Sequence, residues 1–176
     1  MDSVHLTAPV LETDRLILRA PQMSDFDSFL SFMQTDRSKY VRPPEIDKVL
    51  AWRAFAHVTG MWVLRGYGTF IIEERSSGAP IGMTGPWHPV YWPEREIGWA
   101  IWKEDAEGEG VAFEAASAAL NHTFAHLKWD TAVSYIHPDN TRSIALAERL
   151  NAVVDKNAEL PDDGPTVVYR HSAIAP

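Results

Sequence analysis

The hydrophobic and polar positions of the N-terminal part of the chain predict one strand followed by two helices. Residues 11–19 (LETDRLILR) alternate with the two-residue period of a strand. Apolar residues then recur at helical spacing in 26–33, after Ser24 and Asp25, which are suited to an N-cap. The same spacing returns in 46–58. We therefore expect a strand that leads into a pair of amphipathic helices.

The rest of the chain predicts a hairpin and then alternating strands and helices. The β-branched segments 68–74 and 79–84 flank the turn-like sequence RSSG, which is typical of an antiparallel hairpin. The expected elements beyond it are a buried strand (96–102), a long helix (110–128), a strand (132–136), a helix (141–150) and a final strand (166–171). This order predicts a mixed α/β fold with α+β character, in which helices cover one central sheet.

Length and composition favour one soluble domain. The chain has 176 residues, of which 45% are hydrophobic and 23% charged, so we expect a single domain over 1–176 with its core in about 9–171. The sequence contains no cysteine, which excludes disulfides, thiolate zinc sites and a cysteine nucleophile. A core of this size needs no crosslink.

The net charge and the hydropathy of the chain limit the classes of partner and the cellular location that we expect. The formal net charge of -8 argues against non-specific binding to nucleic acid and favours a cationic partner. The N-terminus lacks the basic and apolar regions of a secretory signal, and no apolar run approaches the ~20 residues of a membrane-spanning helix. We therefore expect a cytoplasmic protein that is not bound to a membrane.

A turn bracketed by Gly108 and Gly110 precedes the long helix and forms a candidate anion site. Free backbone N–H groups and the positive end of the helix dipole meet at such a helix N-terminus, and a phosphate is the usual ligand. The amides of about 108–112 could hold a pyrophosphate. The alternative is that both glycines only permit a tight turn from strand to helix.

Motifs along nearly the whole chain resemble those of the GCN5-related N-acetyltransferases (GNAT), in particular the branch that contains the ribosomal-protein N-terminal acetyltransferases. They are LETDRLILR (11–19), IGMTG (81–85), EIGWAI (96–101), GEGVAFEA (108–115) and HPDNTRSIALAERLN (137–151). The resemblance implies a GNAT-type single domain, with a central mixed sheet that splays at its middle strands and helices on both faces. It also implies acetyl-CoA as the acetyl donor. We expect no metal, because the acidic stretch KEDAEGE lacks the alternating oxygen ligands of a calcium loop.

The resemblance implies a cofactor site on three segments. The end of the splayed strand would pair with the pantetheine arm through its backbone, and the glycine turn would hold the pyrophosphate. Asn140, just before the helix over 141–150, would bind the arm through its side chain. The cofactor-binding residues are then Ala100, Ile101, Trp102, Gly108, Glu109, Gly110, Val111, Ala112, Asn140 and Ser143. For Asn140 the alternative is a plain helix N-cap.

Two residues are candidates for the chemistry. Many enzymes of this fold protonate the leaving thiolate with a tyrosine where this chain has Ala147, and the branch it resembles uses a serine at the position of Ser143. Ser143 could instead only cap its helix. Glu96 is the leading candidate for the base, and His88 and His137 are alternatives. Glu96 could instead be only an exposed carboxylate at the end of a strand, without a catalytic role. Without a cysteine, direct attack by the amine is favoured over an acyl-enzyme.

An acidic loop that departs from the family pattern and a loop rich in tryptophan are the unusual features of this chain. Glu107 stands where the family has Gln or Arg, and with Glu104, Asp105 and Glu109 it places four carboxylates near the proposed pyrophosphate, so we expect weakened cofactor binding. Trp87 lies with Trp92 on a loop that the family uses as a wall of the acceptor site; core packing or a homodimer contact is the alternative.

These inferences leave the acceptor open between a protein N-terminus and a small-molecule amine. Two other functions remain as alternatives. One is a catalytically silent protein of the same fold that binds acyl-CoA or a partner, and the other is a polyamine- or peptide-binding module without a cofactor.

Overall fold

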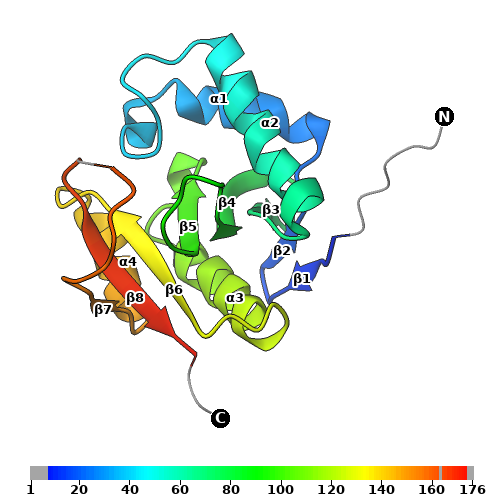
Figure 1. Ribbon diagram of the computed structural model, residues 1–176. Helices are drawn as coiled ribbons and strands as arrows, with labels where there is room; N and C mark the ends of the chain where they lie inside the picture. Colours follow the sequence, from blue (N-terminus) through cyan, green and yellow to red (C-terminus); the bar gives the residue numbers. More distant parts are fainter. Residues whose placement is uncertain (1–7, 163, 174–176) are drawn as a thin grey trace.

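The computed structural model describes residues 8–162 and 164–173, and these form a mixed sheet with helices on both faces (Figure 1). The described part contains eight strands in the order β1-β2-β3-β4-β5-β6-β8-β7. Their bounds are β1 Leu11–Glu12, β2 Leu16–Arg19, β3 Phe70–Glu74, β4 Pro80–Trp87, β5 Glu96–Ile101, β6 Thr131–Ile136, β7 Val153–Val154 and β8 Val167–Ser172. Only the β5–β6 pair is parallel among these neighbours.

Helices pack on the two faces because alternate strand residues point in opposite directions. The helices are α1 (Phe26–Met33), α2 (Lys48–Arg65), α3 (Val111–Ala125) and α4 (Thr141–Arg149), with short 3-10 turns η1 (Met23–Asp25), η2 (Asp36–Ser38) and η3 (Glu104–Ala106). Ile71 of β3 packs into a cluster with α1 and α2, whereas its neighbours Phe70 and Ile72 pack against α3. The predicted fold class, a mixed α/β single domain with helices on both faces, is confirmed.

Two predicted elements differ most from their expected bounds, while β4 extends to Trp87, α3 ends at Ala125 and the short strand β7 was not predicted. The strand expected over 11–19 is divided into β1 and β2, because the Leu16 N–H donates to Thr13 Oγ1 over 3.0 Å and turns the chain. The helix expected over 46–58 runs from an Asp47 cap to Gly66, whose φ of 73° is left-handed. Its last turns carry solvent-exposed Val63 and Leu64, so they lack the amphipathic pattern that would have predicted them.

The sheet divides between β5 and β6. Antiparallel β4 and β5 pair along six positions, but β5 and β6 have the single register pair Glu96 and Val133. In Figure 1 the group of β6, β7, β8 and α4 accordingly stands apart from the end of β5. The predicted splay at the middle strands is therefore present.

Side chains replace the ladder at the point where the strands part. The Ser134 hydroxyl donates to the Ile97 carbonyl over 2.6 Å, and His171 Nε2 lies 2.9 Å from Ser134 Oγ. Burial lowers the pKa of His171 to about 4, so the ring is neutral and its Nε2–H donates to the serine. These bonds hold β5 to β6 up to Ile97, and the strands separate beyond it.

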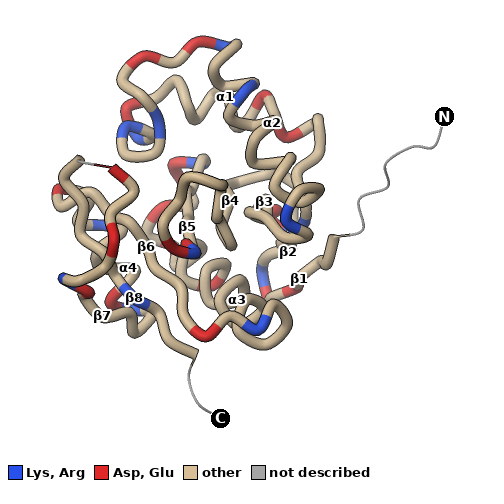
Figure 2. Tube along the Cα trace, viewed as in Figure 1, with Lys and Arg blue, Asp and Glu red and all other residues tan. Residues whose placement is uncertain are grey.

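Charge is distributed over the whole outline of the molecule. Figure 2 shows acidic and basic positions interspersed around the sheet rather than separated onto faces of one sign. None of the helices in the described residues combines the length and the apolarity needed to cross a membrane.

Candidate active site

A cavity of about 840 Å³ opens at the C-terminal end of β5, where the sheet splays. Four segments and Phe32 of α1 line it: the region of η2 (36–41), the end of β5 (99–101), the turn into α3 (106–113) and α4 with its preceding loop (139–149). The volume is within the range of natural small-molecule sites. The cavity thus joins the segments that the sequence predicts to hold the cofactor.

The turn into α3 has the geometry of an open anion site. Gly108 and Gly110 have φ values of 82° and 78°, a left-handed conformation that favours glycine. Gly110 is the N-cap, and no side chain among the described residues bonds to the first amides of α3 at this cap. A Cβ at Gly108 would have no atom within 4 Å, so a ligand can approach the backbone there.

The start of α4 presents two polar side chains to the cavity. Asn140 is the N-cap, and its Oδ1 accepts from the Ser143 N–H over 3.3 Å. The Ser143 hydroxyl oxygen accepts from Trp99 Nε1 over 3.1 Å. All three residues line the cavity. Asn140 therefore serves as the cap that the alternative interpretation expects, while still facing the proposed cofactor position.

The end of β5 is engaged by an arginine. Arg37 of η2 donates to the carbonyls of Trp102 (2.7 Å) and Ile101 (3.1 Å). The Trp102 N–H donates to Ile81. The Trp102 side chain lies in the core against Phe29 of α1 and does not line the cavity. Of the three strand-end residues predicted to meet the pantetheine arm, Ala100 and Ile101 line the cavity.

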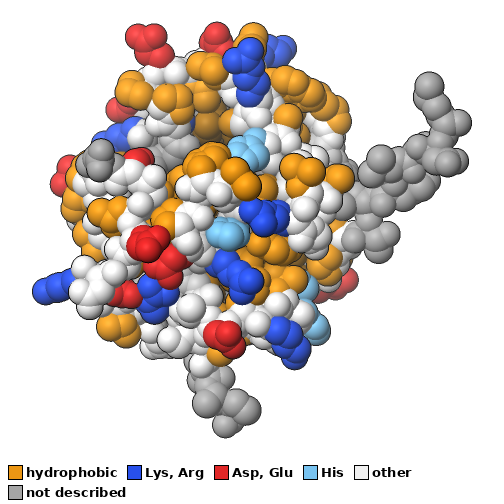
Figure 3. All heavy atoms as spheres, in the orientation of Figure 1, with side chains coloured by type: hydrophobic (Ala, Val, Ile, Leu, Met, Phe, Trp, Pro, Cys, Tyr) orange, Lys and Arg blue, Asp and Glu red, His pale blue; other side chains and the backbone are white. Residues whose placement is uncertain are grey.

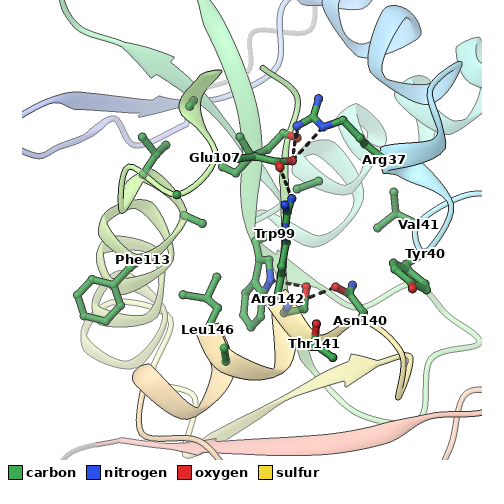
Figure 4. Close-up of a pocket in the computed structure, with 18 of the residues that line it drawn as sticks. Arg37, Tyr40, Val41, Trp99, Glu107, Phe113, Asn140, Thr141, Arg142 and Leu146 are labelled. Atoms are coloured by element: carbon green, nitrogen blue, oxygen red, sulfur yellow. Dashed lines mark hydrogen bonds and ion pairs between the residues drawn. The ribbon is translucent and has the colours of Figure 1, made fainter. Parts of the chain in front are cut away.

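Glu107 lies between two arginines (Figure 4). Its Oε1 accepts from Arg37, with a distance of 2.9 Å to Nε, and its Oε2 accepts from Arg142 of α4. The acidic residue at the family's Gln or Arg position is therefore neutralised inside the cavity. Asp105 of the same loop pairs with Lys103 over 3.3 Å. The repulsion expected from four free carboxylates is smaller than their number suggests, because two of them are paired.

Glu96 at the start of β5 is in a different environment. It is partly buried, and this desolvation raises the pKa of its carboxyl from an ordinary 4.5 to about 7. Two hydrogen bonds oppose the shift: Trp92 Nε1 donates to Oε2 over 2.7 Å, and the Tyr135 backbone N–H donates to the same carboxyl group. Within the described residues Glu96 forms no salt bridge. A carboxylate that titrates near neutral pH suits a general base.

Gly98 leaves space between Glu96 and the cavity. Residues 96, 98 and 100 share one face of β5, and the face from Glu96 to Ala100 extends for about 13 Å. A Cβ at Gly98 would have only Glu96 Oε1 within 4 Å, at 3.9 Å. The position above Gly98 is therefore open beside this carboxyl oxygen, whereas Glu96 itself does not line the cavity. A glycine inside a strand often marks such a close approach.

Aromatic residues surround Glu96 outside the cavity. Trp92 meets Tyr135 edge-on at 5.8 Å, and Trp87, the register partner of Glu96, packs on His57 at 4.7 Å. In Figure 3, histidine and basic side chains lie among hydrophobic ones in the middle of the visible face. The proposed acceptor residues Trp87 and Trp92 thus lie beside Glu96, but they do not line the cavity.

The two histidines considered as bases lie in different settings. Burial lowers the pKa of His88, and the charges of Arg65 and Arg95 lower it further. His137 stacks on Tyr40 at 5.2 Å, and its Nδ1 accepts from the Asp139 N–H over 3.1 Å. This stack joins the η2 region to the loop before α4 beside the cavity, which is a structural role.

The structure brings most of the predicted cofactor residues together. Those that line the cavity are Ala100, Ile101, Gly108, Gly110, Val111, Ala112, Asn140 and Ser143. Glu109 lies outside it, because its carbonyl accepts from Arg15 over 3.0 Å on the other side of the turn. Sequence reasoning missed Arg37, Trp99 and Arg142, whose partners are far away in the chain. Gly98 was missed as well, although a glycine within a strand is a local sign that a ligand or another side chain comes close.

Comparisons with known proteins agree with this geometry. The family model described as Acetyltransferase (GNAT) domain matches residues 15–153. The crystal structure of an acetyltransferase from Agrobacterium tumefaciens is 35% identical, with a TM-score of 0.88 over 98% of this chain and 99% of that chain.

Ribosomal-protein acetyltransferases share the fold at lower identity. A ribosomal L7/L12 alpha-N-protein acetyltransferase in complex with coenzyme A is 17% identical, with a TM-score of 0.73 over 93% of this chain and 98% of that chain. The ribosomal-protein-S5-alanine acetyltransferase from Vibrio fischeri is 13% identical, with a TM-score of 0.72 over 94% of this chain and 97% of that chain.

The splayed sheet and the cavity at its end define the class of the protein as a GNAT-type acetyltransferase. The family match and the 35% identical structure place it further: the chain belongs to the GNAT acetyltransferase family. The family predicted from the motifs is confirmed.

Proposed function

We propose that this protein transfers the acetyl group of acetyl-CoA to a primary amine, by direct attack of the amine. The observation that carries the proposal is the Glu96 carboxyl group. Its pKa is raised to about 7, and one of its oxygens faces the uncovered stretch of β5 that leads to the cavity. A base at this place can receive a proton beside a donor held in the cavity.

The residues of the cavity fit acetyl-CoA. Left-handed Gly108 and Gly110 leave the first amides of α3 uncovered, which suits a diphosphate. Arg142 has a side chain that is 82% exposed and adds a cation at the same end. Asn140 and the end of β5 offer amide and backbone groups for the pantetheine arm. The acetyl-CoA thioester supplies the activated acetyl group.

The proposed reaction needs one proton acceptor and one proton donor. Glu96 takes the proton that the ammonium loses, directly or through water, and the free amine forms the new bond to the acetyl carbon. The carbon–sulfur bond breaks, and its electron pair goes to sulfur. Ser143 gives the sulfur a proton, and the proton that the new amide nitrogen loses returns to the Ser143 oxygen through water. Ala147 has no proton to give, so position 147 supplies no acid, and its side chain is buried among Ile136, Ala152 and Tyr169.

The acceptor is a protein N-terminus or a small-molecule amine. The lower-identity structures named above act on ribosomal proteins. The aromatic residues Trp87 and Trp92 beside Glu96 suit the approach of an amine, through cation–π contact or after its deprotonation. The cytoplasmic location remains a prediction from the sequence.

Calorimetry with acetyl-CoA, followed by a thiol-release assay, tests the proposal. We expect saturable binding and release of free thiol with at least one acceptor from a panel of N-terminal peptides and polyamines. Absence of binding at millimolar acetyl-CoA would remove both the transferase and the silent acyl-CoA-binding protein. Binding without turnover on any acceptor would leave the silent protein, which is the alternative.

A further inference from the structure

The indole of Trp99 makes one polar contact, and it is with the proposed acid. Trp99 is in the middle of β5, and its Nε1 lies 3.1 Å from Ser143 Oγ in the first turn of α4. The two residues are 44 positions apart in the chain. Figure 4 shows the Trp99 ring against the start of α4, beside Asn140. This contact bridges the gap between the separated halves of the sheet.

The position of the ring is set by packing. Trp99 packs against a cluster that includes Leu120 and Ile97, and against a second cluster that includes the buried Ala147. His171 meets the ring edge-on at 6.3 Å. The indole is therefore held from several sides, and its N–H has a defined direction.

The hydrogen bond between Trp99 and Ser143 can have only one direction. An indole N–H can only donate, so the Ser143 oxygen accepts. Ser143 Oγ donates to no other described residue, and Ser143 lines the cavity. The hydroxyl proton is therefore available to a ligand. A hydrogen bond accepted by a hydroxyl also polarises its O–H and strengthens it as a donor.

We propose that Trp99 is a positioning residue that orients and strengthens Ser143 as the proton donor to the departing sulfur. This inference rests on the proposed function. It assigns to the splayed strand a role through a side chain, in addition to its backbone. Trp99 itself contacts neither the acetyl group nor the amine in this proposal, and it acts only through Ser143.

Trp99→Phe tests the proposal, because it removes the N–H and keeps most of the ring. We expect kcat to fall about tenfold, which corresponds to the free energy of one hydrogen bond. KM for acetyl-CoA should change less than twofold. Trp62→Phe is the matched control. It removes another partner-bonded indole N–H, the donor to the Thr69 carbonyl at 3.1 Å, at a place away from the cavity. We expect this control to lose stability without losing kcat.

A double-mutant cycle separates positioning from a structural role. If Trp99 acts through Ser143, Trp99→Phe lowers kcat no further in the Ser143→Ala background, although its effect on thermal stability persists. An equal loss in both backgrounds overturns the inference. So does a Trp99→Phe enzyme as active as Trp62→Phe while Ser143→Ala is impaired. If Ser143→Ala is fully active, the acid assigned under the proposed function fails, and this inference fails with it.

Discussion

Glu96 and Glu107 flank the functional strand, and their surroundings are opposite. Glu107 accepts hydrogen bonds from the guanidinium groups of Arg37 and Arg142. Glu96 accepts from the neutral Trp92 indole and the Tyr135 amide, and among the described residues it has no cationic partner. The same side chain is therefore a neutralised anchor at one end of β5 and a group that titrates near pH 7 at the other.

The difference shows that partners decide what a carboxylate can do. Opposite charge favours the ionised form, whereas desolvation without a counter-charge favours the protonated form. Proton transfer needs a group that changes state near the working pH, and Glu96 meets this condition through its raised pKa. Under the proposed function, Glu107 instead sets the charge that an incoming diphosphate would meet.

The largest expected effect comes from Glu96→Gln, which removes the base and keeps the shape. We expect kcat to fall about a hundredfold, the usual loss for a general base, with acetyl-CoA affinity nearly unchanged. Steady-state thiol release and calorimetry measure the two quantities. Glu94→Gln, which affects a nearby carboxylate paired with Arg170, is the control for loss of charge. Full turnover by Glu96→Gln would show that the base lies elsewhere.

The next effect is the pH dependence that the raised pKa of Glu96 imposes. We expect kcat/KM to fall about tenfold per pH unit below about pH 7, because the protonated carboxyl cannot accept a proton. Glu96→Gln should lose this limb, whereas Glu94→Gln should retain it. A wild-type limb near pH 4.5 would contradict the environment described for Glu96.

The same pKa makes a prediction for stability with a defined sign. The folded state binds the Glu96 proton more tightly than the unfolded state, so between about pH 4.5 and pH 7 the free energy of unfolding decreases as pH rises. This group contributes at most about 3 kcal/mol to that loss. Glu96→Gln lacks this titration, so its free energy of unfolding should rise relative to that of the wild type as the pH increases across this interval. Urea denaturation at pH 5 and pH 8 measures the difference.

The smallest effect concerns Glu107. Glu107→Gln frees Arg142, while Arg37 keeps its bonds to the carbonyls of Ile101 and Trp102. We expect acetyl-CoA to bind about fivefold more tightly, with a gain that shrinks at high salt. Glu104→Gln, in the same loop but outside this network, should change affinity less than twofold. Weaker binding by Glu107→Gln would mean that the carboxylate positions the arginines rather than competing with the diphosphate.

The cofactor half of the site was more predictable than the acceptor half. Its glycine turn depends on neighbouring residues, so Gly108 and Gly110 could be assigned to a tight turn at a helix start from local sequence, and the structure gives both a left-handed φ. The environment of Glu96 depends on the Tyr135 amide from another strand, which no local pattern reveals. The acidic loop misled for the same reason, since Arg37 is 70 positions from Glu107.

The sequence by itself determined the order of the main elements and the glycine turn, because these depend on periodicity and on runs of adjacent residues. The family, and with it the splayed strand, followed from the resemblance of its short motifs. Only the tertiary structure decided the raised pKa of Glu96, the neutralisation of Glu107 and the contact of Trp99 with Ser143. Each of these is a property of side chains that folding brings together from distant positions, with the burial and charge that accompany them.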